Sequence, residues 1–142
     1  PQGAQKVIDA WKPLLKGKTV GVQGSTVNSQ FLENYLKDTI EIREYKTTEQ
    51  HDLDLSAGRV DAIFAAQSSM KATIDQPEFK DMTMVGAGVS GGVLGRGVAV
   101  GLRKGDAELK KNFDDAIQSA IADGTVKKLT EKWFKVDMTP QS

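Results

Sequence analysis

Polar side chains and free backbone groups follow directly after a predicted strand in the segment Gln23–Asn28. The strand is short and alternating, and Ser25, Thr26 and Asn28 lie at the start of an amphipathic helix that begins near Val27. A helix N-terminus presents unpaired N–H groups and the positive end of the helix dipole. Because open α/β sheets bind ligands at the carboxyl ends of their strands, the segment predicts a ligand-binding edge. Ser25 or Thr26 would also cap the helix.

A second candidate edge is Ala65–Ser68, at the end of the third predicted strand. That strand is expected to lie beside the first in a parallel sheet, so the two carboxyl ends would meet at one edge. No side chain in either segment titrates near neutral pH, as a general acid or base must. The two segments therefore favour binding over catalysis.

A glycine pattern similar to a dinucleotide fingerprint occurs at Gly86-x-Gly88-x-x-Gly91, with Asp106 twenty residues after the first glycine. In a dinucleotide site such glycines open a helix whose N-terminus faces the pyrophosphate. Here the residues up to Gly101 are too rich in glycine to form a helix, so we interpret the match as accidental. The chain also lacks a Walker A sequence. No nucleotide cofactor is expected.

Nucleophilic and metal chemistry lack the residues that they need. The chain has no cysteine and a single histidine, His51, which excludes thiolate and multi-histidine sites. Ser56 lies five residues from His51 in the same predicted helix, where the two side chains point in different directions. The surrounding segment, Thr47–Asp54, is polar, so His51 is expected to be a solvated helix residue. We predict no catalytic residue and no metal site.

The charged residues are balanced in sign and dispersed along the chain. Lysine plus arginine equals aspartate plus glutamate, at 19 each, so no net positive field favours nucleic acid. The pairs Asp52/Asp54 and Asp114/Asp115 do not face each other on a helix, and solvated surface charge is the expectation for each. No apolar run is long enough to span a membrane. The composition is that of a water-soluble chain with one core.

Hydrophobic spacing predicts alternating helices and strands in the first half of the chain. The expected elements are a short helix or turn over 5–15, a strand ending at Gln23, a helix over 27–36, a strand over 40–45, a helix from Thr47 to Gly58, a buried strand over 60–66 and a helix over 68–75. Strands that alternate with helices predict an α/β fold with a mostly parallel sheet.

The second half of the chain is expected to add two strands and two helices. The strands are predicted over 82–85 and, after a glycine-rich loop, over 98–102. Asp106 is expected to open a helix that ends at Gly124, and Thr125 to cap a last helix. Each of these helices carries one apolar stripe, formed by Leu109, Phe113, Ile117 and Ile121 in the first and by Val126, Leu129 and Trp133 in the second.

Four segments, taken in order, resemble periplasmic amino-acid-binding proteins of ABC transporters. LKGKTVGVQ, residues 15–23, resembles the start of their second lobe, and AGRVDA, residues 57–62, resembles the turn into its third strand. VAVGLRKGD, residues 98–106, is similar to the return crossing, and residues 123–134 are similar to the closing helices. The resemblance is to type II periplasmic solute-binding proteins of the polar amino-acid or opine class.

This resemblance implies a non-enzymatic, cofactor-free clamp that closes over a polar amino acid, of the arginine, lysine, ornithine or histidine class, or over an opine. Residues 1–102 would form lobe two, and residues 103–142 would be a C-terminal helical segment returning to an absent N-terminal lobe one. An ABC permease in the inner membrane would be the partner, in the periplasm. Pro1–Gly3 shows no signal peptide, so the protein either stays inside the cell or has been trimmed; its beginning favours trimming.

The family also suggests roles for individual residues. The hydroxyls of Ser25 and Thr26 and the N–H of Val27 would contact the ligand carboxylate, in the loop that also contains Gln23 and Asn28. The arginine that grips this carboxylate in the family lies in lobe one and cannot be assigned here.

The second edge departs from the pattern of many amino-acid binders. They carry an aspartate for the α-ammonium where this chain has Ala66, followed by Gln67. The missing acid points to an opine, whose nitrogen is a secondary amine that bears a second carboxylate. The stretch Gly91–Gly97 also looks closer to opine-type binders. Within it, Arg96 either meets the extra carboxylate or is a solvated loop residue.

Two further expectations concern assembly and rival functions. The apolar stripes of the last two helices would lack part of their burial partner, which predicts a swapped or face-to-face homodimer unless the helices fold back onto the lobe. The alternative functions are an enzyme on the same fold, similar to cyclohexadienyl dehydratase, and the sensor domain of a receptor. An enzyme would need a titrating group at the binding edge, and a sensor would need a flanking transmembrane or kinase segment.

Overall fold

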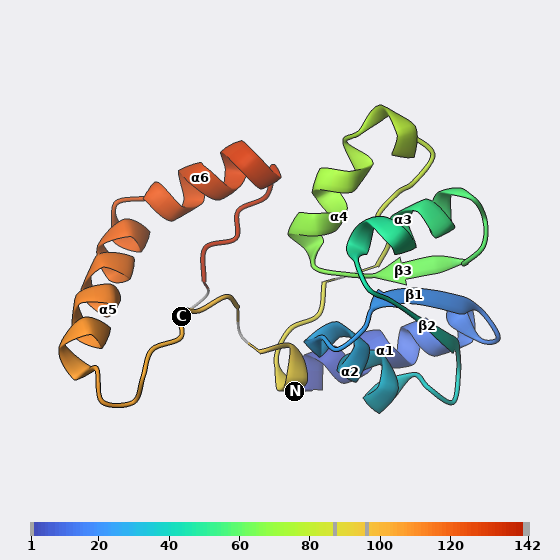
Figure 1. Cartoon of the computed structure of the whole chain (residues 1–142), viewed down its shortest axis with the longest axis horizontal. Coiled ribbons are helices and arrows are strands. Elements are labelled where there is room, and N and C mark those ends of the chain that lie inside the picture. Colours follow the sequence, from blue (N-terminus) through green and yellow to red (C-terminus); the bar gives the residue numbers. More distant parts are fainter. Residues whose placement is uncertain (1, 87, 96, 141–142) are drawn as a thin grey trace. The chain divides into compact units, whose positions relative to one another are not determined.

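A three-stranded parallel sheet forms the centre of the first of two units, Pro1–Arg96 and Gly97–Ser142, into which the chain divides. The computed structural model describes residues 2–86, 88–95 and 97–140. The strands are β1 (Thr19–Gln23), β2 (Glu41–Tyr45) and β3 (Ala62–Phe64), and their order is β2-β1-β3 (Figure 1). Both pairings are parallel, and the third strand lies beside the first, as predicted.

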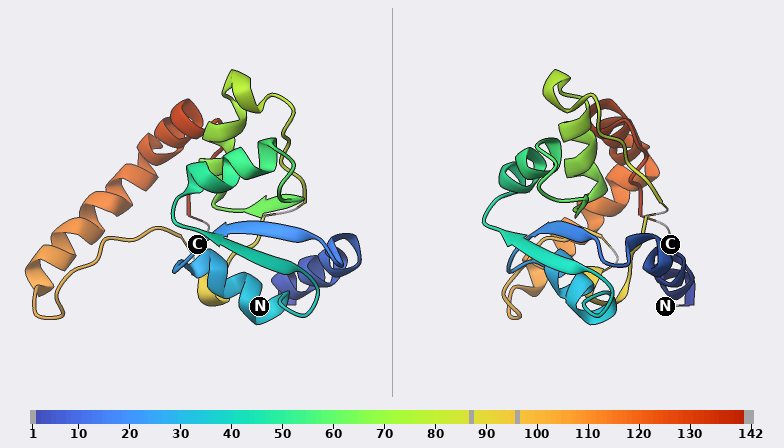
Figure 2. Two further views of the ribbon diagram at one scale, coloured as in Figure 1. Left: turned by 45° about the vertical axis from the view of Figure 1, so that its right-hand side comes forward. Right: turned by 90° about the vertical axis from the view of Figure 1, so that its right-hand side faces the viewer.

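Helices cover both faces of this sheet (Figure 2). Helices α1 (Gln2–Leu15) and α2 (Val27–Tyr35) lie on the face toward which the alternating valines of β1 point, and α3 (Thr48–Ser56) lies on the opposite face, with α4 (Gln67–Ile74) following β3. The buried core on the α1 and α2 face consists of Ile8, Val20, Val22, Phe31, Leu32, Leu36 and Ile40. The predicted α/β fold with a parallel sheet is confirmed.

Aromatic contacts attach the edge strand β3 to this core. Phe64 of β3 stacks on Phe31 of α2, with ring centroids 5.2 Å apart and an angle of 14° between the planes. Trp11 of α1 meets the same ring edge-on, at 6.1 Å. Contacts of this kind add to the free energy gained by burying the rings, and they fix where β3 ends relative to α2.

Helix α3 approaches the sheet closely because β1 has no side chain at Gly21. A Cβ atom at Gly21 would lie 3.2 Å from the Cβ of His51 and 3.3 Å from a methyl carbon of Ile63. The expectation of solvated side chains in this helix was therefore wrong for two residues, since His51 is 1% exposed and Asp52 is 6% exposed. A glycine on the facing strand, which the helix's own sequence does not reveal, makes the space that His51 fills.

Substituting alanine for Gly21 is expected to destabilise the first unit by about 1–3 kcal/mol, because the new methyl group overpacks the contact with His51. Chemical denaturation followed by circular dichroism would measure the change. Gly88→Ala is the matched control, because no heavy atom lies within 4 Å of a Cβ placed there. Equal stability of the two variants would contradict the close approach of α3 to the sheet.

An ion-pair network fixes the other side of α3. The hydroxyl of Tyr45 donates to Asp54 Oδ2 at 2.7 Å, and Arg59 Nε donates to Asp54 Oδ1 at 2.7 Å. Both hydrogen bonds lower the pKa of Asp54 below its ordinary value of 3.8, and the bond from Arg59 has the larger effect. Asp54 is thus partnered instead of freely solvated. Asp114 and Asp115 are exposed, as predicted, and pair with lysines one turn earlier.

This network predicts a pH-dependent contribution to stability. A depressed pKa stabilises the fold above the unfolded value of about 3.8 and loses that contribution as the pH falls through the folded value. The difference in unfolding free energy between the wild type and Asp54→Asn should therefore be present at neutral pH and shrink below about pH 4. Urea denaturation across this range measures it. The pH-dependent difference should shrink in an Arg59→Gln background; an unchanged difference would assign the effect to other groups.

Two predicted strands are absent from the described residues. Residues 82–85 and 98–102 have no regular structure, and Val85 and Val98 are largely exposed, Val98 at 104%. A strand forms only where a neighbour accepts its backbone hydrogen bonds, and no pairing with either segment occurs in the described parts of the chain. β3 consequently lies at the sheet edge, and its residues are only half-buried, in contrast to the predicted buried strand over 60–66.

The second unit consists mainly of α5 (Ala107–Ala122) and α6 (Thr125–Phe134). The chain turns between them at Gly124, which adopts a left-handed conformation at φ 77°. Gly124, and not Thr125, is the N-cap of α6, and the N–H of Thr125 is bonded by the side chain of Asp123 at 2.8 Å. Asp106 precedes α5 as predicted, but its carboxylate accepts from Arg103 instead of capping the helix.

The apolar stripes of these two helices are exposed to solvent. Trp133 is 68% exposed, and the other exposed members of the stripes are Leu109, Phe113, Ile117 and Leu129. Neither helix contains a buried residue. In the described part of the chain, no helix combines the length and hydrophobicity that a membrane span needs.

Candidate ligand-binding edge

The loop between β1 and α2 holds a strained backbone conformation. Ser25 has φ 59°, in the left-handed region that non-glycine residues rarely adopt. Holding such a residue costs about 1–2 kcal/mol, and strain of this kind concentrates at binding and switch regions. Gly24, the residue before it, continues the hydrogen bonding between β1 and β2, since its N–H donates to Tyr45 O at 2.9 Å. The chain thus turns abruptly at Ser25, whose side chain is exposed.

Thr26 caps helix α2, and its hydroxyl group both accepts and donates a hydrogen bond within the protein. Its hydroxyl accepts from the N–H of Ser29 at 3.3 Å and donates to the carbonyl of Gln23 at 2.7 Å. The hydroxyl of Ser29 accepts from the N–H of Thr26 in return, which completes a capping box. The predicted N-cap is confirmed. The Thr26 hydroxyl can donate to a ligand only by releasing Gln23, so Thr26 shapes the loop more than it offers a free donor.

The first turn of α2 retains free backbone donors. Within the described residues, the N–H groups of Val27 and Asn28 have no hydrogen-bond acceptor, as expected for the first positions of a helix. No acidic residue lies in this turn to neutralise the positive end of the helix dipole. The side chain of Gln23 points elsewhere, because its amide donates to the carbonyl of Lys46 at 3.1 Å. These N–H groups and the exposed Ser25 are among the donors that this loop offers to a ligand.

A second helix N-terminus lies at the same edge of the sheet. β1 and β3 pair in parallel through Val22 and Phe64, so both chains leave the sheet together and continue into helices. Ala66 is the N-cap of α4 and provides no side-chain cap. Both Ala66 and Gln67 are exposed. The structure therefore brings the two predicted segments together at one edge, where two uncapped or partly capped helix ends could hold an anionic group.

An acidic residue that the sequence did not single out lies at this edge. Glu44 of β2 faces the loop, and a Cβ atom placed on Gly24 would lie 3.0 Å from Glu44 Oε2. No ion pair of Glu44 is present among the described residues. Its position at the carboxyl end of the second predicted strand was the available signal. Arg96, the other charged candidate, falls outside the described residues.

The side chains of this edge are suited to recognition by hydrogen bonding. Its side chains are hydroxyl, amide, methyl and one exposed carboxylate, and no activated nucleophile accompanies them. Among the described residues, no group of histidine, cysteine and acidic side chains is arranged to hold a metal ion. The buried His51 lies on the side of α3 that packs against β1, and it is not part of the edge.

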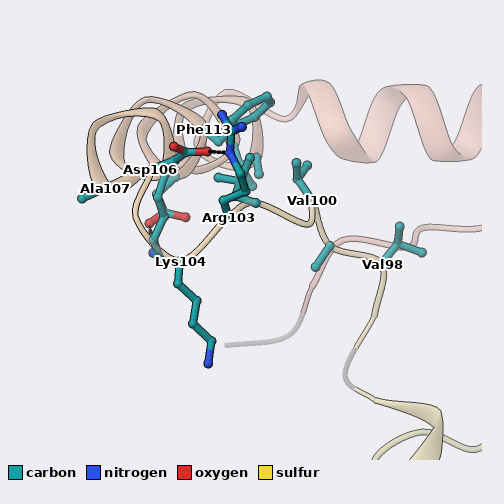
Figure 3. A pocket seen from close by; sticks show the side chains of 12 residues that line it. Val98, Val100, Arg103, Lys104, Asp106, Ala107 and Phe113 are labelled. Atoms are coloured by element: carbon teal, nitrogen blue, oxygen red, sulfur yellow. Dashed lines mark hydrogen bonds and ion pairs between the residues drawn. The ribbon is translucent and has the colours of Figure 1, made fainter.

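A hollow of about 430 Å³ in the second unit has a different character (Figure 3). The extended segment 98–104 and the apolar side of α5, with Phe113 and Ile117, form its walls. Arg103 donates to Asp106 at 2.9 Å, Lys110 pairs with Asp114, and Lys104 points away from Phe113. Its polar groups are thus largely paired already, and the hollow continues the exposed apolar stripe of α5.

Comparison with known proteins identifies the family. A family model described as bacterial extracellular solute-binding proteins, family 3, matches residues 15–136. The octopine-binding periplasmic protein of Rhizobium meliloti is 48% identical over 155 residues, covering 96% of this chain and 52% of that protein. The histidine-binding periplasmic protein of Salmonella typhimurium is 39% identical over 127 residues, covering 87% and 49%. The chain spans about half the length of these curated relatives.

A solved structure agrees with the fold. The second substrate binding domain of a protein described as an amino acid ABC transporter, from Streptococcus pneumoniae, matches with a TM-score of 0.55 and 25% identity, covering 84% of this chain and 53% of that one. These relatives are named as binding proteins, which gives no support to the dehydratase-like or sensor alternatives. The predicted family is confirmed: this chain belongs to the bacterial extracellular solute-binding proteins, family 3.

Proposed function

We propose that the chain forms one ligand-contacting lobe of a periplasmic binding protein that delivers a polar amino acid or an opine to an ABC permease. The observation that carries this proposal is the pair of helix N-termini that follow β1 and β3 at one sheet edge, with free N–H groups and no acidic residue in either first turn. Such an edge suits a carboxylate, which amino acids and opines both carry.

Some residues at this edge are proposed to contact the ligand, and others to hold the loop in position. The exposed hydroxyl of Ser25 and the N–H groups of Val27 and Asn28 bind the carboxylate, and Gln67 contacts the ligand from α4. Thr26 keeps these donors in place through its capping box, and Gln23 fixes the end of β1 against β2. Charge-assisted hydrogen bonds from several N–H groups to one carboxylate account for selectivity toward anions.

An opine is favoured over an ordinary amino acid at this edge. Ala66 supplies no counter-ion for a primary α-ammonium on the β3 side, whereas Glu44 supplies a carboxylate on the β2 side of the same loop. A ligand with a carboxylate near α2 and a cationic group toward β2 fits this distribution of charge. The greater identity to the octopine-binding relative than to the histidine-binding relative, 48% against 39%, supports the same choice.

In this proposal the ligand acts by closing two lobes. Residues 1–102, which contain the first unit, provide one lobe, and residues 103–142 join a first lobe that corresponds to the half of the relatives outside the match. The ligand stabilises the closed form by its differential affinity for that form, and the permease recognises the closed shape. The exposed stripes of α5 and α6 would be covered by the first lobe, or by a second copy in a swapped dimer where the first lobe is missing.

Calorimetric titration tests the proposal directly. The chain would be titrated with octopine, nopaline, arginine, lysine and histidine, alone and together with the amino-terminal lobe of the octopine-binding relative. We expect submicromolar binding of an opine that requires both lobes. Tight binding of a member of this panel by the chain alone would overturn the two-lobed site, and absence of binding by the pair would count against the proposed ligand class.

A further inference from the structure

Helix α4 carries half of the proposed binding edge but is weakly anchored. None of its residues is buried, so apolar packing contributes little to its position. Most of its side-chain hydrogen bonds stay local, such as the one from Lys71 to Asp75 at 2.6 Å. The exception is Thr73, whose hydroxyl donates to Asp52 Oδ2 of α3 at 2.8 Å. Within the described residues, this bond is the side-chain hydrogen bond that ties α4 to another helix.

The acceptor of this bond is a buried carboxylate. Asp52 is 6% exposed, and its Oδ1 lies 2.9 Å from Nδ1 of the buried His51. These two atoms are close but are not aligned as a hydrogen bond, so among the described residues the side-chain hydrogen-bond partner of this carboxylate is Thr73. His51 in turn fills the space above Gly21 on the central strand. Asp52 thus belongs to a helix that packs against the central strand, and its Oδ2 faces α4.

We propose that the Asp52–Thr73 hydrogen bond positions the first turn of α4 for the ligand, which makes both residues positioning residues of the binding edge. The inference rests on the proposed function. Thr73 lies six residues after Gln67, about 9 Å along a helix. Because α4 is short, anchoring its C-terminal end at Thr73 also restrains its first turn. A hydrogen bond to a buried acceptor is stronger than one in water. Without it, the ligand must order α4 at the expense of affinity.

Three substitutions separate this role from general support of the fold. Thr73→Val keeps the shape of the side chain and removes the donor, whereas Thr73→Ser keeps the hydroxyl. Asp75→Asn is the matched control, because it removes a polar link of the same helix that stays local. The first readout is hydrogen exchange of the α3 and α4 amides in the ligand-free chain. The second is opine affinity, measured by calorimetry with the first lobe present.

We expect Thr73→Val to accelerate exchange in α4 and not in α3, and to weaken opine binding about tenfold. Thr73→Ser should restore both to within about twofold, and Asp75→Asn should change neither. Unchanged exchange in α4, or faster exchange with unchanged affinity, would overturn the positioning role. Faster exchange in α3 as well would show that the bond stabilises the whole lobe, and this result would also overturn the positioning role.

The exchange comparison needs no ligand, so it separates the two proposals. Wild-type protein that binds no opine or amino acid would count against the proposed function. The effect of Thr73→Val on α4 exchange would still decide whether Asp52 anchors this helix.

Discussion

Replacing Val27 with proline is expected to weaken ligand binding about ten- to a hundredfold while leaving the chain folded. Val27 is the first residue of α2, where proline is favoured and where the missing N–H has no partner within the helix. Thr26 before it has an extended backbone, at φ −119° and ψ 167°, which a following proline requires. The substitution therefore removes a proposed ligand donor and little else.

The size of this effect follows from the charge of the acceptor. A hydrogen bond to a charged group contributes about 1.5–3 kcal/mol, and each 1.4 kcal/mol is a tenfold change in affinity. Val27→Ala is the matched control, because it shortens a half-exposed side chain and retains the N–H. Calorimetry with both lobes present compares the two variants, and circular dichroism checks that α2 is intact. Equal affinity of Val27→Pro and Val27→Ala would remove the N-terminus of α2 from the site.

The segment Gln23–Asn28 could be predicted as a binding segment because the sequence patterns that indicate it are local. The alternating strand, the threonine cap and the helical spacing after it all occur within the range 19–36, and the structure places β1, Thr26 and α2 there. The parallel pairing of β3 with β1 followed from the alternation of strands and helices along the chain. What the sequence could not show was that the Thr26 hydroxyl is already used by Gln23 and Ser29.

The features that were missed depend on residues far apart in the sequence. His51 lies in a polar stretch, and it is buried because it packs against Gly21, thirty residues earlier, and against the ring of Tyr45. The hydrogen bond from Thr73 to Asp52 likewise joins residues that are 21 positions apart. The strands expected over 82–85 and 98–102 failed in the opposite way, since their apolar pattern was present and their pairing partner was absent from the described residues.

Placing a lysine at Ile117 is expected to reduce self-association of the isolated chain by at least about tenfold. Ile117 lies in the exposed stripe of α5, next to Phe113 in the lining of the hollow in the second unit. Each large apolar side chain that is fully buried on association contributes about 1.5–3 kcal/mol, and a charge in its place would have to be desolvated. The wild-type chain should therefore form dimers or larger assemblies as its concentration rises.

Gln118→Lys provides the matched control. Gln118 is the next residue on the same helix, exposed and outside the stripe, so the substitution adds the same charge without touching the stripe. Sedimentation velocity over a range of concentrations should show self-association for the wild type and for Gln118→Lys, and its loss for Ile117→Lys. If the stripe is the surface that the first lobe covers, adding that lobe should abolish self-association of the wild type. A wild-type chain that stays monomeric at every concentration would show that its exposed stripe does not drive association, and the swapped dimer would then have no physical basis.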